Sequence, residues 1–78
     1  MKGNSMAKMR ANFGKRLRKI RREKDLTQEQ LAEAIGVSMA FVSNMERGVN
    51  APSFETIEKL AEVLGVKVGD FFQFPEDK

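Results

Sequence analysis

Cysteine and histidine are both missing from this chain of 78 residues. Their absence excludes disulfide bonds, zinc fingers, thiol nucleophiles and the imidazole that most often transfers protons in catalysis. Long apolar runs are missing too, since nothing approaches the roughly 18 apolar residues of a membrane-spanning helix. No glycine-rich phosphate loop, metal-ligand cluster or nucleophile–base pair can be recognised. We therefore expect a cytoplasmic protein without a cofactor that is neither an enzyme nor a membrane protein.

Charge is unevenly distributed along the chain. Residues 1–24 hold ten lysines and arginines and one acid, whereas residues 25–78 hold four basic and ten acidic residues. A basic end on an otherwise acidic domain indicates that one surface meets a polyanion, although a basic leader without a partner is an alternative. The first residues lack an apolar period, so we expect a flexible basic leader over 1–11, a folded domain over 12–74 and a tail over 75–78.

Apolar residues at helical spacing predict an all-α domain of about five short helices. The first helix is expected over 12–24, the fourth starts at a Ser53 cap and ends at Gly65, and a last turn or two follows. No stretch alternates like a strand over more than four residues. The apolar faces of the first and fourth helices hold Phe13, Leu17, Ile20, Ile57, Leu60, Ala61 and Leu64.

The second and third helices are marked by their ends. Thr27 and Gln30 form a capping box at the start of the second helix, and Gly36 is expected in the left-handed conformation that stops it. Ser38 caps the third helix, and Gly48 ends it. Because the connection between the two helices is so short, the pair predicts a helix-turn-helix.

The third helix is too short to be stable alone, so one of its faces has to pack on neighbouring helices. We expect its function to lie in the other face, which stays exposed. A short helix with small and amide side chains on that face fits a DNA major groove about 12 Å wide. The alternative is a helix pair that only packs. The residues expected to point outward are Met39, Ala40, Ser43 and Asn44.

Three sequence blocks carry a resemblance to a known family. They are Thr-Gln-x-x-Leu-Ala at 27–32, Gly-Val-Ser at 36–38 and Glu-Arg-Gly at 46–48. With these blocks, residues 13–72 resemble the DNA-binding domain of the lambda-repressor and Cro family, the Xre-type regulators. The resemblance implies a compact lambda-repressor-like domain whose recognition helix is 38–47. It also implies a sequence-specific transcriptional regulator that binds palindromic operator half-sites of double-stranded DNA as a homodimer.

The resemblance also implies roles for single residues. Met39, Ala40, Ser43 and Asn44 occupy the base-reading positions, but Met39 and Ala40 cannot make the bidentate adenine contact of the glutamines found in relatives. We therefore expect weak direct readout and more specificity from DNA shape. Phe41 either packs on the second helix or touches DNA. The implied phosphate contacts come from Gln28, Ser38, Arg47 and the amides of Val49 and Asn50, and the implied structural salt bridge joins Arg21 to Glu46.

The C-terminal region is unusually rich in large apolar residues. Part of this cluster has to close the core, and any exposed remainder predicts a homodimer interface. The alternatives are that the whole cluster stays in the monomer core, or that it binds a heterologous protein in an antitoxin or adaptor built on the same fold. The residues assigned to the interface are Val68, Phe71, Phe72 and Phe74.

Overall fold

The computed structural model describes residues 5–74, and this part of the chain is helical without strands. It confirms the predicted all-α class and corrects the predicted count of about five helices, because residues 5–74 form four α-helices and one short 3-10 helix. Within the described range, no helix is long and apolar enough to cross a membrane. The elements are α1 (Ser5–Glu23), α2 (Gln28–Ile35), α3 (Met39–Glu46), α4 (Phe54–Leu64) and the 3-10 helix η1 (Val68–Phe72).

The ends of α2, α3 and α4 lie where capping residues predict them. The Thr27 side chain accepts a hydrogen bond from the Gln30 N–H, and the Gln30 side chain accepts one from the Thr27 N–H. Ser38 and Ser53 each accept from the N–H three residues on, at 3.1 Å. Gly36 ends α2 at φ 77°, a conformation in which a side chain with a Cβ is strained. These predicted helix ends are confirmed.

Helix α1 is longer than the sequence predicts. It begins at Ser5, so the predicted flexible leader is wrong for residues 5–11, while residues 1–4 and the predicted tail 75–78 lie outside the described residues. The added turns are rich in alanine, lysine, methionine and arginine, which favour helix. They also have a tertiary contact: a Cβ on Gly48 would lie 2.9 Å from the Ala11 Cα, so α1 touches the loop after α3.

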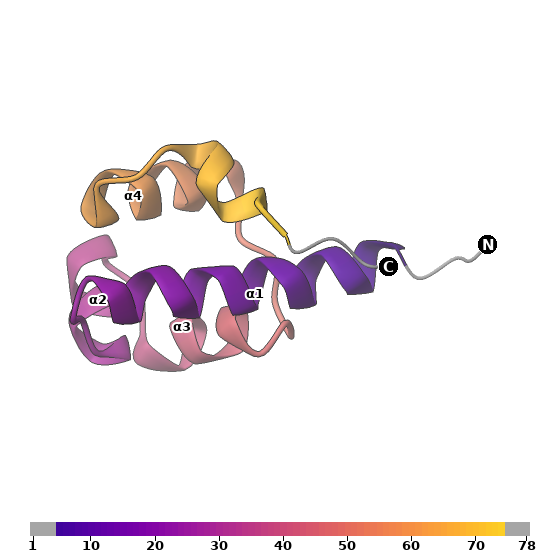
Figure 1. Cartoon of the computed structure of the whole chain (residues 1–78). Helices are drawn as coiled ribbons and strands as arrows, with labels where there is room; N and C mark the ends of the chain where they lie inside the picture. The colour runs from indigo at the N-terminus through magenta and orange to yellow at the C-terminus, as the bar shows by residue number, and fades with distance from the viewer. Residues whose placement is uncertain (1–4, 75–78) are drawn as a thin grey trace.

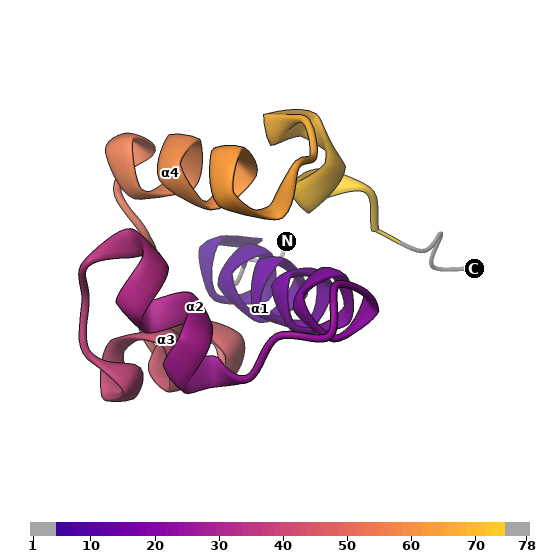
Figure 2. The same ribbon diagram turned by 90° about the vertical axis from the view of Figure 1, so that its left-hand side faces the viewer.

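Helix α1 runs through the middle of the molecule, with α3 on one side and α4 and η1 on the other (Figures 1 and 2). Helix α2 contacts both α3 and α4 and so joins the two sides. The backbones of α1 and α3 approach closely at Gly14, where a Cβ would lie 2.5 Å from the Glu46 carbonyl oxygen. The buried apolar residues are Phe13, Leu17, Ile20, Leu31, Ala32, Ile35, Val42, Met45, Ile57, Leu60, Ala61, Leu64 and Phe71.

The 3-10 helix η1 closes one end of the core. Phe71 is fully buried, and its ring lies 5.6 Å from that of Phe13 between centroids. The assignment of Phe71 to a dimer interface is therefore wrong, because its side chain is buried in the core of the monomer. Val68 and Phe72 remain partly exposed, at 43% and 38%. Arg16 Nε donates to the Asp70 carbonyl oxygen at 2.7 Å and ties η1 to α1.

Candidate nucleic-acid interface

The turn between α2 and α3 is held by hydrogen bonds and by packing. The Val37 N–H donates to the Ala32 carbonyl oxygen at 3.0 Å, and the Gly36 N–H donates to the carbonyl oxygen of Glu33 at 3.3 Å. The Val37 side chain is partly buried against the core. Since the left-handed Gly36 fixes the chain direction here, α3 leaves the turn at a set angle to α2. The two helices form the predicted helix-turn-helix.

Helix α3 has one buried face and one outward face. Val42, Met45 and Glu46 are buried. Met39, at the first turn, is 52% exposed, and Ala40 beside it is exposed as well. The outward face is completed by Ser43 and Asn44, which are both partly exposed.

Phe41 belongs to the packed side of α3. Its side chain is partly buried and lies against the hydrophobic core cluster. The sequence left open whether Phe41 packs within the domain or touches DNA, and in the structure it packs. The outward face therefore consists of short or flexible side chains, which suits close approach to base edges.

Asn44 and Arg47 interact at the end of the outward face. Arg47 Nη1 donates to Asn44 Oδ1 at 3.2 Å, in a hydrogen bond that is exposed to solvent. A side-chain amide has two acceptor lone pairs and two donor hydrogens. The Asn44 side chain can therefore still donate from its nitrogen to acceptors on a base edge while Arg47 orients it.

The loop after α3 differs from what the resemblance implies. The N–H groups of Val49 and Asn50 both donate to the Asn44 carbonyl oxygen, at 2.8 and 3.3 Å. Because these bonds satisfy the carbonyl end of α3, the two amides are directed inward, and their implied role as phosphate donors is corrected. Ser38 and the exposed Arg47 keep groups that can donate to a phosphate, since the Ser38 oxygen is used only as an acceptor in its cap.

A buried ion pair supports α3 from behind. Arg21 donates from Nε to Glu46 Oε2 at 2.5 Å and from Nη2 to Glu46 Oε1 at 3.0 Å, a two-point geometry that fixes both side chains. The two residues are 7% and 3% exposed. Arg21 Nη1 also donates to the Leu26 carbonyl oxygen at 2.7 Å. The pair that the resemblance implies is therefore present, and it links α1, the α1–α2 turn and α3.

Two further donors converge on the same carboxylate. Gln28 Nε2 donates to Glu46 Oε1 at 3.0 Å, and Arg18 Nε lies 3.5 Å from the same oxygen. Spacing along the chain gave no sign of either contact, because both depend on how the helices cross. Gln28 thus donates one amide hydrogen to Glu46, and its second amide hydrogen can donate to a phosphate.

These partners decide the protonation of Glu46. Burial by itself would raise the pKa of its carboxyl group, because an uncharged acid is favoured away from water. Hydrogen bonds from Arg21 and Gln28, together with the charge of Arg21, outweigh burial and hold the pKa of Glu46 below its ordinary value. Glu46 is therefore ionised at neutral pH and balances the charge of Arg21.

Residues 17–71 match the family described as Helix-turn-helix. The chain belongs to the helix-turn-helix family. Its helix-turn-helix relatives include the control protein C.BamHI of Bacillus amyloliquefaciens, which is 36% identical over 67 residues, or 85% of this chain and 83% of that protein. Some other curated relatives are longer, and the chain spans 34% of PuuR of Escherichia coli and 52% of the phage repressor RstR of Vibrio cholerae.

Several solved structures resemble this fold, among them two that are similar over most of both chains. The restriction-modification controller protein C.AhdI from Aeromonas hydrophila superposes with a TM-score of 0.81 at 36% identity, covering 85% of this chain and 96% of that one. SinR, solved in complex with DNA, superposes with a TM-score of 0.73 at 34% identity, covering 78% and 98%. These matches confirm the predicted family and fold. The matched proteins are regulators, which agrees with the prediction that the chain is not an enzyme.

Proposed function

We propose that this chain is the DNA-binding domain of a sequence-specific transcriptional regulator that acts as a homodimer on palindromic half-sites. The observation that carries the proposal is the outward face of α3, whose short side chains are supported from behind by the buried Arg21–Glu46 pair. A reading helix has to be held rigidly if it is to discriminate bases. The structure of SinR in complex with DNA supports the same use of this fold.

The groups around α3 divide into two roles. Met39, Ala40, Ser43 and Asn44 lie on the outward face and contact base edges. Met39 and Ala40 offer apolar contact to thymine methyl groups, whereas Asn44 and Ser43 offer hydrogen bonds. Gln28, Ser38 and Arg47 flank this face and contact phosphates, which positions the helix without reading sequence.

Selection from a random pool of DNA duplexes tests this function. We expect a motif with two inverted half-sites whose centres lie about one helical turn apart. With six or more phosphate contacts, affinity should fall about a thousandfold between 50 and 200 mM salt.

The control variant is Arg47→Ala, which removes a phosphate contact. It should weaken binding to all duplexes and flatten the salt dependence by about one contact, while the selected motif stays the same. A wild-type chain that enriches no motif at moderate salt would contradict the proposed function.

A further inference from the structure

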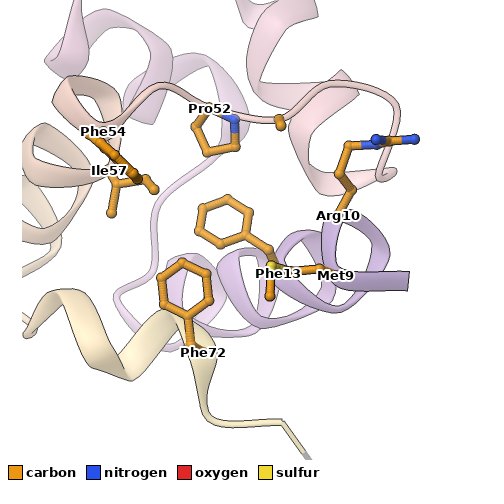
Figure 3. Close-up of a pocket in the computed structure, with 8 residues that line it drawn as sticks. Met9, Arg10, Phe13, Pro52, Phe54, Ile57 and Phe72 are labelled. Carbon is orange, nitrogen blue, oxygen red and sulfur yellow. The ribbon is translucent and has the colours of Figure 1, made fainter. Parts of the chain in front are cut away.

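An apolar groove opens beside the loop that follows α3. It has a volume of about 270 Å³ and lies between the N-terminal half of α1, the loop 51–52, the start of α4 and the end of η1. Figure 3 shows Phe54 and Ile57 on one side of it and Met9 and Arg10 on the other. Apart from Arg10, its lining is uncharged: Met9, Phe13, Ala51, Pro52, Phe54, Ile57 and Phe72.

Phe54 stands at the edge of this groove and is 87% exposed. It is the first residue of α4, and the Ser53 cap and the buried face of α4 fix its position. Met9, which also lines the groove, is a further large apolar side chain that is 55% exposed. Single exposed apolar residues are common, but an exposed phenylalanine beside an apolar hole is a feature of binding surfaces.

We propose that the groove receives Phe54 of a second copy of this chain, and that the exchange is reciprocal. The inference rests on the homodimer of the proposed function and names its interface. A protruding ring and a hole on one face of the same molecule are what a two-fold interface needs, because each copy then supplies both parts. Charge is complementary as well, since the exposed Glu55 follows Phe54 in the chain and Arg10 is the charged residue of the groove lining.

This interface is compatible with DNA binding. The lining residues include none of Met39, Ala40, Ser43 or Asn44, so a second copy in the groove leaves the outward face of α3 uncovered. The groove adjoins the loop that follows α3, and the two-fold axis of the proposed dimer relates the two recognition helices to each other. Both helices can then meet the same side of one duplex, as inverted half-sites about one helical turn apart require.

Of the four residues in the predicted interface, the proposed one keeps only Phe72. Phe72 is common to both, and its ring lies 5.6 Å from that of Phe13 at the base of the groove. Val68 does not line the groove. Eight residues line the groove, which is fewer than the roughly 20–30 residues that each partner contributes to a standard interface. We therefore expect a weak dimer in solution, and complete dimer formation on a duplex that carries two half-sites.

Sedimentation equilibrium of the whole chain across a concentration series tests the interface without DNA. Phe54→Ser should weaken self-association at least tenfold. Because Phe54 is exposed, the variant should keep the wild-type thermal midpoint. The matched control is Val63→Ser, which removes a 39% exposed side chain from α4 outside the groove and should leave association unchanged.

Three results would overturn the inference. One is equal association of wild type and Phe54→Ser, and another is a loss of association in Val68→Ser but not in Phe54→Ser. The third is a wild-type chain that remains monomeric even on a two-site duplex, as expected if the groove serves a different protein. Binding of single half-site duplexes separates the two proposals, because it does not require a dimer. A chain whose dimer needs Phe54, but that prefers no duplex over another, would retain this interface and refute the proposed function.

Discussion

Replacing Gly14 with alanine should destabilise the fold by about 2–3 kcal/mol, although alanine is the better helix former. Gly14 is buried within α1, where α1 crosses the end of α3. A Cβ at this position would overlap the carbonyl oxygen of Met45 and lie 2.5 Å from that of Glu46. Both oxygens belong to the backbone of α3, so they cannot rotate away as a side chain can. The gain of up to about 1 kcal/mol from helix propensity is therefore outweighed.

Gly69→Ala provides the matched control for Gly14→Ala. A Cβ on Gly69 would meet nothing within 4 Å, so this change should stay within about 0.5 kcal/mol of wild type. For a domain of this size, the loss in Gly14→Ala corresponds to a Tm lower by roughly 10–20 °C. Thermal and denaturant unfolding followed by circular dichroism measures both. A Gly14→Ala chain as stable as the Gly69→Ala chain would show that α1 and α3 do not approach as closely as described.

Replacing Glu46 with alanine should cost about 3 kcal/mol of folding stability at neutral pH. The change leaves the buried guanidinium of Arg21 without its acid, and it also removes the hydrogen bond that Gln28 donates. An unpaired buried charge is far more costly than a lost surface pair. The matched control is Glu23→Ala, which breaks the exposed pair with Lys19 at 3.8 Å and should change stability by less than about 1 kcal/mol.

The effect of Glu46→Ala should depend on pH in a defined direction. The pKa of Glu46 is lowered in the folded chain, so its contribution is fully present above the ordinary glutamate pKa of about 4.3 and is lost as the pH falls through the lower folded pKa. The stability difference between wild type and Glu46→Ala should therefore shrink in acid. A melting temperature unchanged by Glu46→Ala at pH 7 would rule out the supporting role of the pair.

Local chemistry explains why so much of the helix-turn-helix was predictable. A cap needs only a hydroxyl and an amide three residues apart, and Thr27, Ser38 and Ser53 all supply this within the sequence itself. Gly36 likewise meets a requirement of its own backbone. The same reasoning separated the buried and outward faces of α3, because both follow from the helical period.

The missed features depend on contacts between distant segments. Nothing in the sequence shows that Gly14 lies against the end of α3. Nor does it show that Ala11 contacts Gly48, so that the N-terminal turns of α1 pack against the loop after α3. Within the C-terminal cluster, three phenylalanines have the same intrinsic hydrophobicity, yet only the approach of η1 to α1 makes Phe71 the buried one. Nothing in the sequence indicates that Phe54 is exposed beside a groove, because its exposure and the groove both depend on how the helices pack.

The outward face of α3 is tested most directly by changing one exposed side chain on it and repeating the duplex selection. Met39→Gln is the best choice, because Met39 is 52% exposed at the first turn of the helix and its replacement should not alter stability. A glutamine there can bond adenine through both its acceptor and its donor. We expect adenine to be enriched at one position of each half-site, with the rest of the motif unchanged. If Met39→Gln and wild type select the same motif, α3 does not read bases through this face.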